Sequence, residues 1–218
     1  MKRSFKNCLS LSFILMAHLT GSAKTLALSA DKTGPSLRLT VRVFNYAQVS
    51  PETWNLAQEV AARILHRTGT ETHWVKCSLS SEGTLTPAVC EQPAQPSDLV
   101  LRLVPVSAAT RAQFGDGTLG IAAQPEKGTP GSASVFYSRV EELAKGGTAS
   151  VPVILGHAAA HEIGHLLLGS NSHSPLGLMR ARWSRQDLQN ARVGNLLFMP
   201  EQAAAVRTCA LRRLSNGQ

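Results

Sequence analysis

The chain has few aromatic residues and few cysteines. Phe, Trp and Tyr make up 5% of its 218 residues, so any core must be built mainly from Ala, Val, Leu and Ile. Four cysteines are too few for a scaffold held together mainly by disulfides. A mean hydropathy near zero excludes a protein with many membrane spans, and 43% hydrophobic residues exclude a disordered chain. The length fits one domain or two small lobes.

Acidic residues are also scarce, because 14 Asp and Glu against 22 Lys and Arg leave a net charge of +8. A basic excess is typical of proteins that bind nucleic acid or anionic surfaces. Here the basic residues are spread along the chain. Those near its C-terminal end, Arg207, Arg212 and Arg213, have no aromatic residues interleaved with them. We therefore expect no nucleic-acid partner.

Part of the basic excess lies in an N-terminal segment that has the order of a secretory signal. Lys2, Arg3 and Lys6 precede an apolar run at 9–19 and small residues at 21–23. The run has about 11 residues and a spanning helix needs roughly 20, which disfavours the alternative of an uncleaved anchor. We expect a signal peptide at 1–23 with cleavage after Ala23, a secreted or periplasmic protein, and no stable membrane span. The mature net charge would fall to +5.

Export changes the interpretation of the cysteines, because an oxidising compartment favours pairing. Cys77 and Cys90 enclose 12 residues rich in Ser, Thr and Pro. We predict a disulfide between them that holds an exposed loop. Cys209 lies on an amphipathic stretch, where the simplest interpretation is a buried thiol.

Hydrophobic periodicity divides the remaining chain into strands and helices. Alternation at period two, or a short apolar run, predicts strands at 37–44, 72–77, 99–104, 118–123 and 133–137. Capping residues, nearby prolines and helical spacing predict helices from Ser50 to near Gly69 and from Ser150 to Leu168, with further helices from about 184 and at 201–214. The predicted fold class is α+β with an α/β-like upper lobe: a twisted mixed sheet of about five strands, a backing helix and a second, apolar helix. A small, mostly helical C-terminal lobe would follow.

The second helix carries His161, Glu162 and His165. Two histidines four residues apart lie about 40° apart around a helix, so both imidazoles can reach one ion. Glu162 is about 100° round from His161, which suits contact with a metal-bound water better than direct ligation. Two imidazoles with an open position suit catalytic Zn²⁺, which would lower the pKa of the water while Glu162 accepts its proton.

The alternative is that the two histidines are core residues whose ring nitrogens form hydrogen bonds within the protein. His157 is compatible with this alternative, because it adds a third histidine one helical turn before His161. A 157/161 pair would place Ala158 where the base should be, so only His161 and His165 are accompanied by a carboxylate. The helix is otherwise apolar and should be buried, where polar side chains need partners. We favour the metal site, with His157 as a supporting or packing residue.

The segment HEIGHLLLGSNSHSPLGLM resembles the active-site segment of metzincin zinc endopeptidases, especially matrixin-like members. The resemblance implies a catalytic domain at 24–218, with an upper lobe at 24–169 and a lower lobe at 170–218. His161 and His165 would be zinc ligands, Glu162 the general base and Met179 the methionine of the turn below the metal. The function implied is a secreted, zinc-dependent endopeptidase that acts on extended peptides.

The third ligand departs from the family pattern. The family has HExxHxxGxxH, whereas this chain has HExxHxxxGxxxH. Gly169 therefore lies one position, and His173 two positions, later than the family pattern places them. Counted without gaps, Asn171 occupies the ligand position. Because asparagine is a poor zinc ligand beside imidazole, we assign His173, with Asn171 as the alternative.

The resemblance also implies a substrate-binding edge strand, with Leu119, Gly120, Ile121 and Ala122 pairing with the peptide. Arg180, Arg182 and Trp183 would border the pocket beyond the scissile bond, where the basic groups would bias its preference. Peptide or protein substrates are the expected partners, and we expect a monomer. The competing function is a binding module with the same fold that holds zinc but turns over little. Glu162 favours the enzyme, since structural zinc sites are usually closed by four protein ligands.

Overall fold

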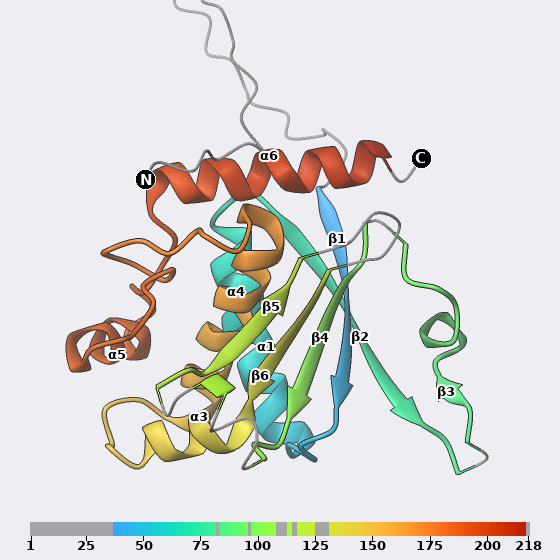
Figure 1. Cartoon of the computed structure of the whole chain (residues 1–218), viewed down its shortest axis with the longest axis horizontal. Helices are drawn as coiled ribbons and strands as arrows, with labels where there is room; N and C mark the ends of the chain where they lie inside the picture. Colours follow the sequence, from blue (N-terminus) through green and yellow to red (C-terminus); the bar gives the residue numbers. More distant parts are fainter. Residues whose placement is uncertain are drawn as a thin grey trace, which may run out of the picture.

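Two long helices, α1 and α4, pack against one face of a six-stranded sheet (Figure 1). The computed structural model describes residues 37–81, 83–95, 97–107, 113–114, 117–124 and 131–216. The predicted signal peptide at 1–23 lies outside the described residues, so it stays a prediction.

The sheet has the strand order β3-β2-β1-β4-β6-β5. Strands β1, β2, β4 and β6 run parallel, with Val41 opposite Trp74 and Val43 opposite Leu101. The two outer strands, β3 and β5, are antiparallel to their neighbours. The strands span Arg38–Asn45 (β1), Glu71–Leu79 (β2), Leu85–Thr86 (β3), Leu99–Val104 (β4), Gly120–Ala123 (β5) and Ser132–Phe136 (β6). The sheet is mixed, as predicted, with six strands where about five were expected.

Helix α1 (Pro51–His66) begins as its sequence predicts. The Ser50 side chain accepts a hydrogen bond from the Thr53 backbone N–H at 3.2 Å, and Pro51 occupies the first turn. One face of α1 is buried against the sheet and α4, through Trp54, Ala57, Val60, Ala61, Ile64 and Leu65. The 3.6-residue spacing of these side chains is the pattern from which a helix was predicted here.

Helix α4 (Val151–Leu168) is buried almost along its whole length, because α1, α3, α5, α6 and the strands β4, β5 and β6 surround it. It ends at Gly169, whose φ of 102° is costly for residues with a side chain. Among the described residues, α4 is also the one helix long and apolar enough to span a membrane. In the fold, 78% of that stretch is buried, as in a core helix.

Three short elements were not predicted: β3, the 3₁₀ turn Ala88–Cys90 and α3 (Tyr137–Ala144). The predicted strand at 133–137 ends at Phe136, and Tyr137 opens α3. The predicted disulfide between Cys77 and Cys90 is present. Cys209 is buried, as expected, but in the full-length chain it is disulfide-bonded and is not a free thiol.

The chain beyond α4 is irregular until α5 (Arg185–Arg192), and α6 (Pro200–Asn216) completes it. In Figure 1 the red helix α6 runs along the top of the view, across the end of α4 and beyond the upper ends of β1 and β2. The Arg213 side chain donates a hydrogen bond to the carbonyl of Leu166 at 3.0 Å, which satisfies one of the last carbonyls of α4. The end of α4 is thereby fixed by α6.

Candidate metal centre

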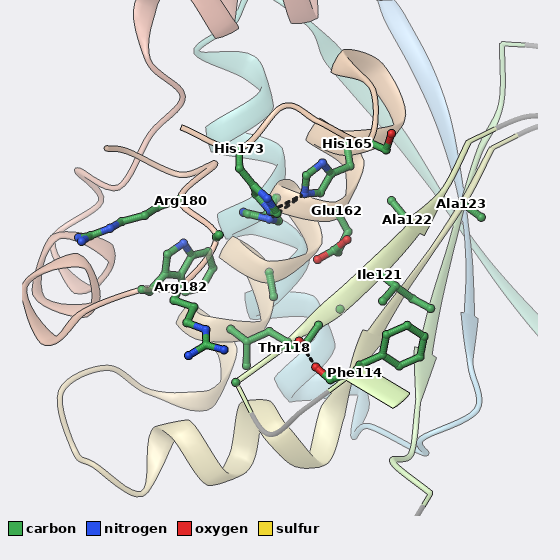
Figure 2. Close-up of a pocket in the computed structure, with 18 residues that line it drawn as sticks. Phe114, Thr118, Ile121, Ala122, Ala123, Glu162, His165, His173, Arg180 and Arg182 are labelled. Atoms are coloured by element: carbon green, nitrogen blue, oxygen red, sulfur yellow. Dashed lines mark hydrogen bonds between the residues drawn. The ribbon is translucent and has the colours of Figure 1, made fainter. Parts of the chain in front are cut away.

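Three histidine side chains converge beside the C-terminal half of α4 (Figure 2). The Nε2 atom of His165 lies 3.1 Å from Nε2 of His161 and 3.1 Å from Nε2 of His173. All three candidate ligand atoms lie within 4.8 Å of one another. We call this set the histidine group.

Each histidine of α4 is oriented by a hydrogen bond at its other ring nitrogen. Nδ1 of His161 donates to the carbonyl of Leu178 at 2.8 Å. The hydroxyl of Ser172 donates to the carbonyl of Gly169 at 2.7 Å, so its oxygen can accept from Nδ1 of His165 at 3.0 Å. With the hydrogens on Nδ1, both Nε2 atoms present lone pairs to the centre of the group.

The histidine group fits a zinc ion. In a tetrahedral site with Zn–N bonds of about 2.0–2.1 Å, neighbouring ligand nitrogens lie about 3.3 Å apart, close to the 3.1 Å found twice here. The lone pairs of His161 and His165 face each other with no hydrogen between them, which is repulsive unless a cation lies there. Burial lowers the pKa of His161 to about 4 and also lowers the pKa of His165, so both rings are neutral near pH 7, the form that binds metals.

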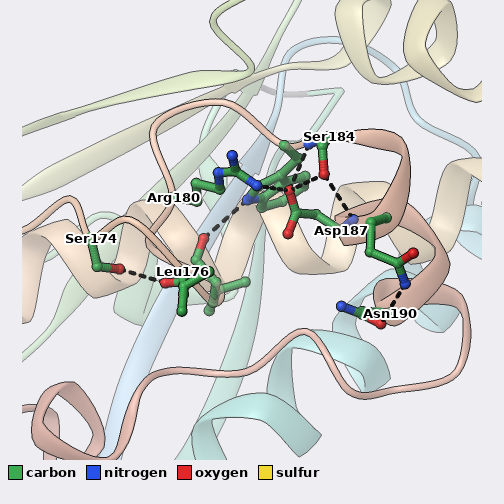
Figure 3. Close-up of polar contacts among 9 residues, drawn as sticks. Ser174, Leu176, Arg180, Ser184, Asp187 and Asn190 are labelled. Atoms are coloured by element: carbon green, nitrogen blue, oxygen red, sulfur yellow. Dashed lines mark hydrogen bonds and ion pairs between the residues drawn. The ribbon is translucent and has the colours of Figure 1, made fainter.

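A loop between α4 and α5 positions the third histidine. The carbonyl of Ser172 accepts a hydrogen bond from the Gln202 side chain of α6 at 3.0 Å. On the other side, the Ser174 backbone N–H donates to the carbonyl of Met179 at 2.9 Å, and the Ser174 hydroxyl donates to Leu176 at 2.7 Å (Figure 3). His173 is thus held between two fixed neighbours and belongs to the group. Asn171 is exposed and is not among the described residues that line the cleft.

Glu162 lies next to the histidine group and is 4% exposed. Burial raises its pKa to about 8, and its Oε2 atom has no hydrogen-bond partner among the described residues. The side chain faces Gly120 of β5: a Cβ added there would lie 2.7 Å from both Cγ and Oε1 of Glu162. A cation at the histidine group would favour the charged carboxylate, and in that form Glu162 can accept a proton from a water between them.

Met179 is fully buried and packs against α4. A Cβ added at Gly164 would lie 2.7 Å from the sulfur of Met179 and 2.8 Å from the ring of Phe198, so only glycine lets the methionine approach α4 this closely. Trp183 donates from its indole nitrogen to the carbonyl of Leu178 at 3.1 Å, the same carbonyl that orients His161. The Trp183 ring also contacts that of His161, so Trp183 packs directly against the histidine group.

His157 takes the supporting position expected of it. It is 1% exposed, its Nδ1 donates to the carbonyl of Val153 at 2.7 Å, and its ring meets that of Trp183 edge-on at 6.2 Å. It does not belong to the histidine group. Trp183 thus contacts both His157 and His161.

The histidine group and Glu162 open into a cleft of about 580 Å³ between β5 and the segment 180–183. All four predicted strand residues, Leu119 to Ala122, line it, as do Arg180, Arg182 and Trp183. In the described part of the chain β5 has a neighbour only on its β6 side. Its backbone on the other side is therefore free to pair with an extended chain.

Three contributors to the site were not predicted: Ser172, Gln202 and Gln124. Gln124 follows β5 and donates from its side chain to the carbonyl of His165, tying the edge strand to α4. Phe114, which also lines the cleft, was not predicted either. Ser172 and Gln124 lie outside helices and strands, where periodicity gives no signal, and nothing in the sequence distinguishes Gln202 from the other polar residues of α6.

No family model matches the sequence, and no curated protein matches it. Among solved structures, archaemetzincin from Methanopyrus kandleri is similar, with a TM-score of 0.50 and 13% identity over 84% of this chain and 99% of that chain. A zinc-dependent peptidase from Methanocorpusculum labreanum has a TM-score of 0.49 and 15% identity, over 76% of this chain and 99% of that one. The similarity to the first structure shows that the chain has an archaemetzincin-like fold, which confirms the predicted combination of mixed sheet and helices.

Proposed function

We propose that the protein is a zinc-dependent endopeptidase. The observation that carries the proposal is the buried Glu162 carboxylate beside three converging histidine nitrogens, in a cleft bordered by an open strand edge. The archaemetzincin-like fold and the zinc-dependent peptidase among the similar structures agree with it. The closer, matrixin-like resemblance rests on residues 174–179 and stays a prediction.

The residues have distinct roles in this proposal. His161, His165 and His173 would hold Zn²⁺, which supplies a Lewis acid that polarises the scissile carbonyl and acidifies a water molecule. Glu162 would accept the proton of that water at its unpaired Oε2 and pass it to the leaving amine. Met179 and Trp183 would keep the ligands in place by packing against α4 and against the His161 ring.

Substrate would bind along β5. An extended peptide beside Gly120 and Ile121 would gain backbone hydrogen bonds from the open edge and run past Glu162. This mode needs no particular side chain at most positions. It therefore suits peptide or protein substrates of varied sequence.

We also propose that the protein is exported after removal of residues 1–23. The order of charges, apolar run and small residues supports a signal peptide. The disulfide between Cys77 and Cys90 is the kind of bond that persists in an oxidising compartment. N-terminal sequencing of the protein from its native culture would test this, with Lys24 as the expected first residue.

The proposed activity is tested by comparing wild type with Glu162→Gln. We expect about one bound zinc per chain in both, because Glu162 is not a ligand, and cleavage of casein and of an internally quenched peptide by the wild type only. Equal activity in both proteins would refute the role of Glu162. Metal analysis of His173→Ala and Asn171→Ala tests the third ligand: only the histidine variant should lose zinc affinity.

A further inference from the structure

The cleft has an uneven distribution of charge. Apart from the histidines, three charged residues line it among the described residues: Glu162, Arg180 and Arg182. Glu162 is buried beside the histidine group and is the only acidic one. The side of the cleft formed by 180–183 therefore has positive charge without an acidic residue of its own.

Arg180 is already neutralised. Its Nη1 lies 2.9 Å from Oδ2 of Asp187, and the same oxygen accepts hydrogen bonds from the Ser184 backbone N–H and hydroxyl, both at 2.7 Å (Figure 3). Figure 2 shows the Arg180 side chain pointing away from the histidine group, towards α5. Arg180 anchors the start of α5 and has little capacity left for a ligand.

Arg182 differs from Arg180 both in its partners and in the direction of its side chain. It is exposed in the cleft, and it makes no ion pair or side-chain hydrogen bond with the described part of the chain. Figure 2 shows it beside Thr118, on the cleft side of the segment. Its Nε lies 3.6 Å from the position that a Cβ on Gly117 would occupy, so the guanidinium lies against a residue with no side chain to cover it.

A guanidinium group in this position matches one kind of partner. Its planar set of donors binds a carboxylate through two parallel hydrogen bonds, and such charge-assisted bonds are the strong ones. Peptides supply carboxylates from two sources, the side chains of Asp and Glu and the C-terminal end. We propose that Arg182 binds a substrate carboxylate close to the scissile bond, and thereby sets the preference of the cleft for acidic peptides. The proposal rests on the proposed peptidase function.

The test uses the zinc-loaded protein and matched peptides that differ in one group. In the first pair both peptides have an amidated C-terminus, and the residue next to the cleaved bond is Glu in one and Gln in the other. In the second pair both peptides have Gln next to the cleaved bond, and the C-terminus is free in one and amidated in the other. We expect the carboxylate-bearing peptide of one pair to have a kcat/KM roughly 10- to 100-fold higher. The pair that shows the preference identifies the source of the carboxylate.

Variants assign the preference to one residue. Arg182→Gln should bring the ratio close to one, and Arg182→Glu should reverse it in favour of a Lys peptide. Arg180→Gln should keep the wild-type ratio, since Asp187 already engages Arg180. Arg185→Gln, an exposed arginine on α5 outside the described lining of the cleft, is the control for a general loss of positive charge.

A binding measurement separates this proposal from the peptidase proposal. The Glu162→Gln variant should bind the carboxylate peptide more tightly than its amide counterpart, and Arg182→Gln in the same background should remove the difference. Equal cleavage and equal binding of both peptides would overturn the role of Arg182 while the peptidase function stands. A wild type that cleaves neither peptide would overturn both proposals.

Discussion

Gly120→Ala tests whether the position of Glu162 depends on the edge strand. The added Cβ would lie 2.7 Å from Cγ and Oε1 of Glu162 and 2.6 Å from the carbonyl of Ser134. Ordinary contacts of a Cβ begin at 3.4 Å, so each of these contacts must open by about 0.7 Å or more. The contact with Ser134 can open only by a shift of β5 relative to β6, and the contact with Glu162 by displacement of its side chain, so we expect the carboxylate to move. A misplacement of about 1 Å at a catalytic group costs up to roughly 100-fold in rate.

The assay is kcat/KM on a quenched peptide, with zinc content and thermal unfolding measured on the same samples. We expect a loss of roughly 10- to 100-fold in kcat/KM with zinc retained, because Glu162 is not one of the proposed ligands. Gly146→Ala is the matched control: it lies beyond α3, and its added Cβ would approach only the carbonyl of Leu143, at 3.4 Å. Full activity in a normally folded Gly120→Ala would show that Glu162 does not act from the position seen here.

Four further results are expected. Gly164→Ala should lower the free energy of unfolding by about 1–3 kcal/mol through overpacking against Met179; an unchanged urea midpoint would contradict the packing described. Replacing Cys77 and Cys90 together by serine should cost about 3 kcal/mol, as expected for a loop of this length, measured by the same unfolding assay. Chelation should lower thermal stability, and zinc about 100-fold above its Kd should return about 3 kcal/mol; identical melting curves with and without chelator would argue against the metal site. At Asp187, burial raises the pKa, but hydrogen bonds from Ser184 and the charge of Arg180 outweigh it and hold the pKa below its usual value. The stabilisation relative to Asp187→Asn should therefore be complete near neutral pH and disappear as the pH falls below about 4; a difference that persisted in acid would contradict it.

The elements predicted best are those in which local and tertiary preferences agree. Helix α1 combines an N-cap, an early proline and one apolar face, and it was found within a few residues. Helix α3 follows β6 without a turn and buries only Arg139 and Val140. A helix of 8 residues that begins where a strand ends leaves no boundary for periodicity to detect. The pairing of β3 with β2 likewise depends on a loop closed by Cys77 and Cys90.

The residues of the site also divide into some that local sequence could predict and others that it could not. His161, Glu162 and His165 could be predicted because the helical repeat alone fixes their relative directions. The third histidine lies on an irregular loop, where sequence spacing does not determine distance. The anchoring of that loop by Gln202 and Ser174 brings His173 beside His165, which the spacing alone could not show. The two arginines of the cleft posed the same problem, since nothing in the sequence indicates that Asp187 engages one of them and leaves the other unpaired.

The burial of α4 links the chemistry of the site to the stability of the fold. A helix buried on nearly every side would be most stable with apolar residues throughout, yet it carries Glu162 with an unpaired oxygen and two histidines whose Nε2 lone pairs face each other. Each of these groups costs stability in the absence of a partner. The protein satisfies the Nδ1 atoms of both histidines. Within the described residues, Oε2 of Glu162 has no donor, and the two Nε2 atoms have only each other and Nε2 of His173 within hydrogen-bond distance. A cation and the water beside it are the partners that satisfy all three at once, so the free energy that holds the metal is also free energy that stabilises the helix.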